Sequence, residues 1–142
     1  MSEFILDANI LIYAFRADSV HHEVCRDWLS EQLQQGVELS TPSVVELALL
    51  RITTLPKYAQ NPSSPAQVFR FLDALHQGSY SNLEPSKLHR SFFEQTCQQF
   101  NLVGNDVNDA YLVALALEND ATLVSLDQGF KRFPKLKWLA PS

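Results

Sequence analysis

The sequence is poor in features that define several protein classes. Its two cysteines, Cys25 and Cys97, have no metal-binding or redox spacing, so we expect free thiols in a reducing cytoplasm. No apolar run approaches the roughly 20 residues that cross a bilayer. The start, Met-Ser-Glu-Phe, lacks the basic region of a signal peptide. Internal repeats and low-complexity tracts are also missing. We therefore expect a cytoplasmic protein with no membrane partner.

Basic residues are scarce over most of the chain. The formal net charge is −5, yet residues 1–129 hold 7 basic and 16 acidic residues, a charge of −9, while residues 130–142 carry +4. An acidic protein binds nucleic acid poorly through nonspecific phosphate contacts. Either nucleic acid is not the partner, or a cation neutralises much of the negative charge in one site.

The composition and the hydrophobic pattern predict one globular domain, residues 1–142, of the α/β class. The chain is 46% hydrophobic and 19% charged. Short apolar runs without alternation, typical of a mostly parallel sheet, alternate with helical patterns. The expected strands are 4–6, 37–40, a short one within 78–83, and 121–126. The expected helices begin at Asn9 and span 21–35, 41–54, 66–77, 85–100 and 107–119, with a surface loop at 55–65.

Asp7 is the first candidate for a functional residue. It directly follows the apolar run Phe4–Leu6, and the carboxyl ends of buried parallel strands are where open α/β sheets bind ligands. A purely local interpretation is equally open, in which Asp7 is a turn or cap residue and Asn9 caps the helix that follows.

Three further carboxylates stand where the local pattern favours apolar or neutral residues: Glu46, Asp109 and Asp127. Each has a local explanation, namely a capping box with Ser43 for Glu46, the helix dipole for Asp109, and a turn for Asp127. If all four acids converge at one edge of the sheet, their repulsion requires a cation. Carboxylates without histidine or cysteine favour Mg²⁺ or Mn²⁺, which can support phosphoryl chemistry.

Five motifs in order along nearly the whole chain resemble a PIN-domain ribonuclease, specifically a VapC-type toxin of a bacterial toxin–antitoxin pair. They are Phe4-Ile-Leu-Asp7-Ala-Asn9, Val44-Val-Glu46-Leu followed by Leu50-Arg51-Ile-Thr53, Gly104-Asn105-x-Val107-x-Asp109-Ala110, Leu123-Val-Ser125-Leu-Asp127-x-x-Phe130, and Phe133-Pro-x-Leu-Lys-Trp138.

The resemblance implies a three-layer α/β/α fold and a Mg²⁺-dependent endoribonuclease, with Mn²⁺ as a substitute. Metal-activated water would attack the RNA phosphodiester in line and leave a 5′ phosphate. The residues that would hold the metal are Asp7, Glu46, Asp109 and Asp127, and those that would orient them are Asn9 and Ser125. Many relatives carry a further aspartate where this chain has Gly129, which puts one extra ligand in doubt. The expected partners are RNA, a VapB-type antitoxin and a second copy of the chain.

The basic residues have two open interpretations. Arg51, Lys131 and Arg132 could guide the RNA backbone, together with Lys57, Lys135 and Lys137. The basic end could equally be a solvated tail. The apolar helices 44–55 and 66–77 would carry the dimer and antitoxin contacts that the family implies.

Alternative functions also remain. A non-catalytic PIN-like scaffold that binds protein or RNA is the main one, although all four acids are present. A haloacid-dehalogenase-like phosphatase is disfavoured, because it needs an aspartate where this chain has Asn9.

Overall fold

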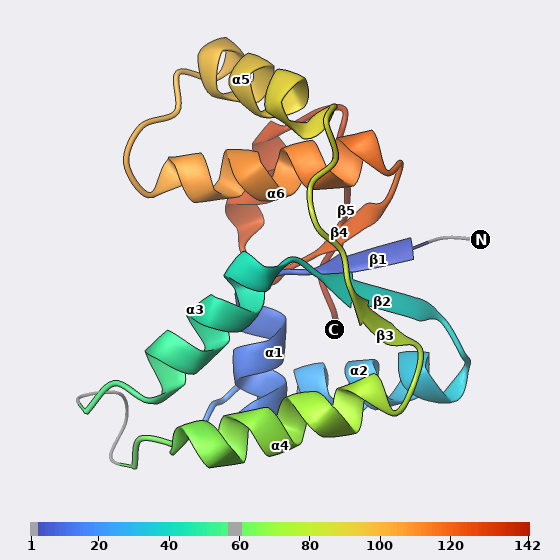
Figure 1. The fold of residues 1–142 in the computed structure, drawn as a ribbon, viewed down its shortest axis with the longest axis vertical. Coiled ribbons are helices and arrows are strands. Elements are labelled where there is room, and N and C mark those ends of the chain that lie inside the picture. The colour runs from blue at the N-terminus through green and yellow to red at the C-terminus, as the bar shows by residue number, and fades with distance from the viewer. Residues whose placement is uncertain (1–2, 57–60) are drawn as a thin grey trace.

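A five-stranded parallel sheet forms the centre of the computed structural model, which describes residues 3–56 and 61–142 (Figure 1). The strands lie in the order β3-β2-β1-β4-β5. Their bounds are β1 Glu3–Leu6, β2 Glu38–Thr41, β3 Tyr80–Asn82, β4 Thr122–Val124 and β5 Lys137–Leu139. Lys57, one of the residues expected to guide RNA, lies outside the described residues.

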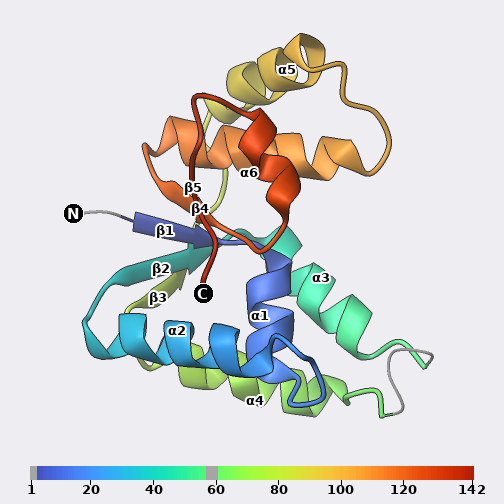
Figure 2. The ribbon, with the colours of Figure 1, turned by 180° about the vertical axis from the view of Figure 1, so that it is seen from behind.

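Helices cover both faces of the sheet, as the two opposite views show (Figures 1 and 2). One layer contains α1 (Ala8–Phe15), α2 (His22–Gln34) and α4 (Pro65–His76), and the other contains α5 (His89–Gln99) and α6 (Asp106–Glu118). Helix α3 (Ser43–Thr53) leaves the carboxyl end of β2 and runs beside α1. The predicted α/β class with a parallel sheet and three layers is confirmed. None of the helices described is both long and apolar enough to span a bilayer.

The two central strands, β1 and β4, are buried on both faces. Ile5, Leu6, Leu123 and Val124 have no exposed surface, which explains why their sequences show no alternation. Each such side chain contributes about 1.5–3 kcal/mol by leaving water. Both cysteines are free, as expected, and Cys25 is buried in this core.

The chain reverses its direction of travel across the sheet between β1 and β4. It first passes from β1 through β2 to β3, and then returns to form β4 on the other side of β1. Leu6 pairs with Val124, and the amide of Asp7 donates to the carbonyl of Val124 at 2.9 Å. The residues that follow these two strands, Asp7 and Ser125, therefore lie side by side at a topological switch point, the usual ligand position in such sheets.

Two predicted helix starts are wrong, because side chains from distant segments fix the backbone there. The helix expected from Pro85 begins at His89, since Ser86 is bound through both its amide and its hydroxyl to Glu118. Thr41 ends β2 and does not cap α3, whose first amide, that of Ser43, donates to Glu84 at 2.6 Å.

The basic end of the chain is neither a tail nor unstructured. It forms a 3₁₀ helix, η1 (Gln128–Arg132), and the edge strand β5, which the sequence analysis did not predict. The indole nitrogen of Trp138 donates to the carbonyl of Ser125 at 3.0 Å, which holds β5 against the end of β4.

Candidate functional site

Asp7 is both a helix cap and a residue at the carboxyl edge of the sheet, the two positions that the sequence left open. It is the N-cap of α1, where its Oδ1 accepts from the amide of Ala8 at 2.7 Å, and it stands at the carboxyl edge of the sheet. Its Oδ2 accepts from Ser125 Oγ at 2.7 Å and from Asn9 Nδ2 at 3.3 Å. The expectation that Asn9 caps α1 is wrong, because the Asn9 side chain turns to these groups.

Ser125 and Asn9 join the ends of β1 and β4 through a buried network. The Ser125 hydroxyl has no exposed surface and accepts from Asn9 Nδ2 and from the amide of Asp127, both at 3.0 Å. The Asn9 Oδ1 accepts from the amide of Leu126 at 3.3 Å. These bonds fix the orientation of Asp7 and of the backbone that carries Asp127, which is the geometry expected of supporting residues.

Asp109 and Asp127 complete a group of three aspartates. Asp109 comes from the first turn of α6, and Asp127 caps η1 by accepting from the amide of Gly129 at 2.8 Å. Burial raises the pKa of Asp109 to about 6, and the negative charges of Asp127 and Asp7 add to this rise, while Arg132 opposes it. Burial also raises the pKa of Asp7, against the hydrogen bonds from Ser125 and Ala8, with a further rise from Asp127.

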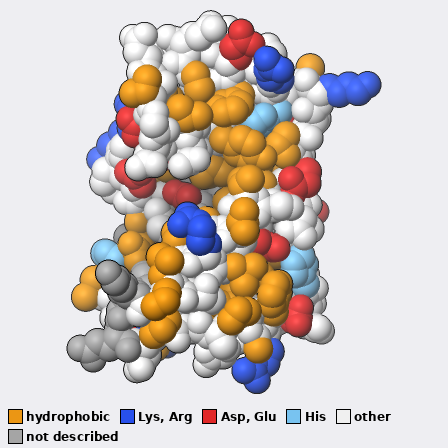
Figure 3. Space-filling view, turned by 60° about the vertical axis from the view of Figure 1, so that its left-hand side comes forward, with side chains coloured by type: hydrophobic (Ala, Val, Ile, Leu, Met, Phe, Trp, Pro, Cys, Tyr) orange, Lys and Arg blue, Asp and Glu red, His pale blue; other side chains and the backbone are white. Residues whose placement is uncertain are grey.

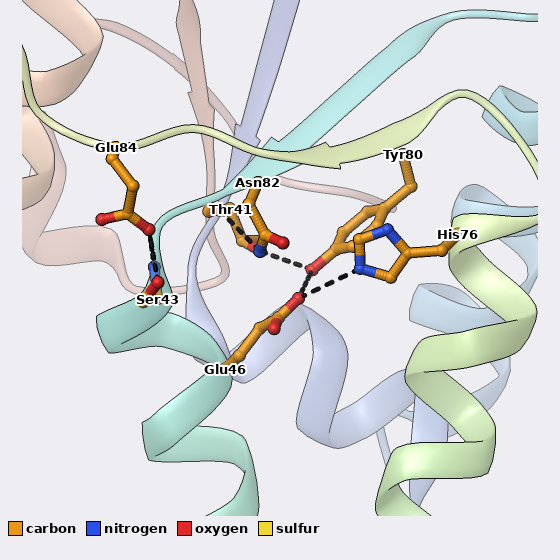
Figure 4. Close-up of polar contacts among 7 residues, drawn as sticks. All are labelled: Thr41, Ser43, Glu46, His76, Tyr80, Asn82 and Glu84. Carbon is orange, nitrogen blue, oxygen red and sulfur yellow. Dashed lines mark hydrogen bonds and ion pairs between the residues drawn. The ribbon is translucent and has the colours of Figure 1, made fainter.

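Glu46, the fourth acid predicted to hold the metal, points toward Tyr80 and His76 in this structure (Figure 4). The electrostatic coupling that joins the three aspartates does not include it. Its Oε2 accepts from the Tyr80 hydroxyl at 2.7 Å and lies 3.6 Å from His76 Nε2. Tyr80 also forms a hydrogen bond with Thr41. Nor does Glu46 close a capping box with Ser43, since α3 has no side-chain cap. Glu46 therefore connects α3 to β3 and α4.

The face of α3 beside Asp7 carries other residues. Val44, Leu47, Ala48 and Arg51 follow the i, i+3, i+4, i+7 spacing of one helix face, and all four line a cleft that also contains Asp7. Glu46 falls off this face. The spacing separates Glu46 from these four residues, but which face of α3 turns toward the aspartates depends on contacts with distant residues.

The cleft has a volume of about 390 Å³ and is lined by α3 on one side and by α5 and α6 on the other. Phe93 and Tyr111 contribute aromatic rings to its wall, and Asn108 contributes an amide. The space-filling view shows a hollow between two groups of hydrophobic side chains, with basic and acidic atoms at its centre (Figure 3). Neither Phe93 nor Tyr111 was among the site residues expected from the sequence.

The basic residues expected to contact RNA are unequally placed. Arg51 is exposed at the cleft, and Arg132 lies against the acidic group, with its Nη2 3.0 Å from Asp109 Oδ2. Lys131 lies 5.8 Å from the ring centroid of Trp138, and Lys137 pairs with Asp120 at 2.8 Å. Contact with RNA stays a prediction for each of them.

The donor chemistry of this edge fits a hard divalent cation. Asp7, Asp109 and Asp127 supply carboxylate oxygens. Burial raises the pKa values of Asp7 and Asp109, the negative charge of Asp127 adds to both rises, and a bound cation would relieve that repulsion. Within residues 3–56 and 61–142, no three acidic, histidine or cysteine side chains are already close enough to form a metal centre. The three aspartates are thus candidate ligands whose side chains must draw together around an ion.

The fold and this acidic edge define an α/β protein with a ligand site at the switch point of a parallel sheet. The chain belongs to the PIN-domain family, whose model matches residues 4–136. It is 36% identical over 137 residues to the VapC ribonuclease Mb2897 of Mycobacterium bovis, with 96% of this chain and 93% of that protein covered. Ribonuclease VapC25 of Mycobacterium tuberculosis is 30% identical over 139 residues, which cover 97% and 98% of the two chains.

Solved structures share the fold at lower identity. A chain of VapBC2 from Rickettsia felis, bound to a DNA fragment from its promoter, matches with a TM-score of 0.72 and 22% identity over 99% of both chains. A chain of VapBC-1 from nontypeable Haemophilus influenzae matches with a TM-score of 0.68 and 20% identity over 97% of both chains. The PIN-type fold expected from the motifs is thus confirmed.

Proposed function

We propose that this protein is a divalent-metal-dependent endoribonuclease that acts as the toxin of a toxin–antitoxin pair. The observation that carries the proposal is the electrostatic coupling of Asp7, Asp109 and Asp127 near the switch point of the sheet, where the pKa values of Asp7 and Asp109 are raised. The 36% identity to a VapC ribonuclease over 96% of the chain supports RNA as the substrate.

The residues around the aspartates have distinct parts in this reaction. A Mg²⁺ or Mn²⁺ ion held by Asp7, Asp109 and Asp127 would supply a Lewis acid that activates water and stabilises the departing oxygen. Ser125 donates to Asp7 Oδ2 and thereby favours the ionised carboxylate that a metal needs. Asn9 donates to the same oxygen at 3.3 Å. Arg132 keeps Asp109 paired with a positive charge.

The toxin role requires a protein partner, and we propose a VapB-type antitoxin and a second copy of the chain. The solved structures with this fold include VapBC complexes. Large apolar side chains are exposed after α3 and on α4, namely Leu55 at 44% and Phe69 at 52%. Exposed apolar surface of this kind is typical of protein contacts.

The test is cleavage of a fluorophore-quencher single-stranded RNA by the purified protein, with Mn²⁺ or with EDTA. We expect cleavage that requires metal and falls about 100-fold or more in Asp109→Asn, because a group that stabilises the transition state is lost. Asp106→Asn is the matched control, since Asp106 lies in the same turn of α6 and its side chain is 61% exposed. It should retain activity within about threefold, as surface changes usually do.

Two results would contradict the proposal. Equal cleavage by the wild type and Asp109→Asn would indicate a contaminant or a different site. No cleavage of single-stranded RNA or of a tRNA panel by folded protein with Mn²⁺ would favour the non-catalytic scaffold.

A further inference from the structure

We propose that the cleft between α3 and the α5–α6 pair binds one unpaired nucleotide of the RNA, next to the phosphodiester that is cut. This inference rests on the proposed ribonuclease function. Arg51 would contact the phosphate, and the base would lie against Phe93 and Tyr111. The cleft would thereby position an unpaired stretch of RNA at the aspartates.

The position and size of the cleft support this occupant. Asp7 belongs both to the acidic group and to the lining of the cleft, so a bound group there is adjacent to the reacting edge. The volume of about 390 Å³ lies within the roughly 300–1,000 Å³ of small-molecule sites. This size suits a small ligand such as a single nucleotide.

The wall formed by α5 and α6 presents fixed aromatic rings. Phe93 and Tyr111 meet edge to face with their centroids 5.8 Å apart, and His89 packs against Tyr111 at 4.6 Å. Both Phe93 and Tyr111 are only partly buried. Unpaired bases stack on such rings without strong sequence preference, and Asn108 beside them can donate to or accept from a base edge.

The opposite wall supplies the positive charge that a phosphate needs. Arg51 is exposed on the last turn of α3, and none of the described residues forms an ion pair or hydrogen bond with its guanidinium. Arg132, in contrast, is already paired with Asp109. An RNA backbone that approaches three aspartates is repelled unless a cation lies close by, and a guanidinium binds phosphate oxygens in a bidentate manner. Figure 3 shows the hollow on this face with its apolar sides.

The experiment measures binding of a fluorescein-labelled RNA hexamer by anisotropy in the Asp109→Asn background, where cleavage is absent. Arg51→Gln should weaken binding about five- to tenfold and reduce the slope of log K against log salt by about 0.7, since one phosphate contact is lost. Phe93→Leu should weaken binding about fivefold with an unchanged slope, because it removes stacking and no charge. In the otherwise wild-type enzyme, both changes should raise KM more than they lower kcat.

Matched controls come from α5, at positions outside the cleft lining. Arg90→Gln removes an exposed arginine of α5, and Phe92→Leu shortens a partly buried phenylalanine next to Phe93. Both should bind the hexamer within about twofold of the parent, as surface changes do. Thermal melting of all variants verifies that each one is folded.

Three outcomes would overturn the inference. Unchanged affinity in Arg51→Gln and Phe93→Leu would exclude the cleft as an RNA site. An equal loss of RNA affinity in Arg51→Gln and Arg90→Gln would mean that Arg51 contributes only general surface charge. Unchanged RNA affinity together with a lost dimer in sedimentation would assign the cleft to a second copy. RNA binding is measured separately from cleavage. A wild-type protein that does not cleave RNA would therefore contradict the proposed ribonuclease function, while the binding data would still test the cleft.

Discussion

Arg132 donates a hydrogen bond from Nη2 to Asp109 Oδ2 across 3.0 Å, which joins η1 to the first turn of α6. The guanidinium also lies 3.9 Å from Asp106 and 4.7 Å from the ring centroid of Phe133. Gly129 leaves the room for it, since a Cβ there would lie 2.9 Å from Arg132 Nη1. Asp109 is thus already paired with a positively charged side chain of the same protein.

This pairing predicts that Arg132 competes with a divalent ion for Asp109. Arg132→Gln should bind Mn²⁺ about two- to fivefold more tightly, corresponding to the loss of a partly exposed ion pair of up to ~1 kcal/mol. Calorimetric titration of the metal-free protein measures this directly.

Lys131→Gln serves as the control for general charge, because Lys131 lies beside Trp138. It should leave Mn²⁺ binding unchanged. Weaker Mn²⁺ binding by Arg132→Gln would instead mean that Arg132 holds Asp109 in the position of a ligand.

Glu46 gives a second prediction, because it lies outside the aspartate group. Glu46→Gln should keep Mn²⁺ affinity and RNA cleavage within about twofold of the wild type, since changes that touch neither the metal nor the substrate are usually neutral. Glu46→Ala should lower the free energy of unfolding by about 1 kcal/mol, the usual loss for one hydrogen bond. Tyr80→Phe should lower the free energy of unfolding by a similar amount. The double variant Glu46→Ala/Tyr80→Phe should lose less than the sum of the two single losses, because both changes remove the same hydrogen bond.

Urea denaturation and the cleavage assay together check this prediction, with Asp109→Asn as the inactive reference. If Glu46→Gln loses as much activity as Asp109→Asn, the active protein places Glu46 at the aspartates, and the contact with Tyr80 does not persist in it.

The sequence carried the information for the central part of the site. Asp7 and Asp127 could be placed because each follows a buried parallel strand, and the carboxyl ends of such strands share one edge. Glu46 could not be placed in this way, since the face of α3 that turns toward the aspartates depends on packing against Tyr80 and His76. No local pattern records these contacts, which join residues 34 and 30 positions apart in the chain.

Some elements of the fold could likewise be predicted from local sequence, and others depend on contacts between distant residues. Helices α2, α4 and α6 begin within a residue or two of their predicted starts, because periodicity and capping are local. Strand β5 has three residues, among them the exposed Lys137, and is recognisable only through its pairing with β4. The contact between Arg132 and Asp109 likewise depends on how η1 lies against α6.

Ser125 provides a third prediction. Its hydroxyl donates to Asp7 Oδ2 at 2.7 Å, and this bond lowers the pKa of Asp7 against the effect of burial. Ser125→Ala should therefore weaken Mn²⁺ binding about tenfold, a typical loss when a group that orients a ligand is removed. The loss should be greater at pH 6 than at pH 8, because more Asp7 is then protonated.

Ser40→Ala is a closely matched control, since Ser40 of β2 is also a buried serine, with its hydroxyl bound to Glu3 at 2.8 Å. It should lose stability as Ser125→Ala does and keep the Mn²⁺ affinity. Equal Mn²⁺ affinity in both variants would remove Ser125 from the metal site.

The raised pKa of Asp109 gives a fourth prediction, for the metal-free protein. Between its ordinary pKa of 3.8 and the folded value of about 6, Asp109 ionises more readily in the unfolded chain than in the folded one. Its contribution to stability is therefore present below pH 4 and is lost as the pH rises through about 6. In EDTA, the free energy of unfolding of the wild type should fall relative to Asp109→Asn by about 1 kcal/mol over this interval, after allowance for solvent screening.

Urea denaturation at pH values from 4 to 7.5 measures the difference between the two proteins. Added Mn²⁺ should stabilise the wild type above pH 6 and have little effect at pH 4.5, because binding requires ionised carboxylates. The Asp109→Asn protein should gain much less from Mn²⁺ at any pH. Two parallel curves in EDTA would mean that Asp109 has an ordinary pKa, and that Arg132 and water already balance the charges of Asp7 and Asp127.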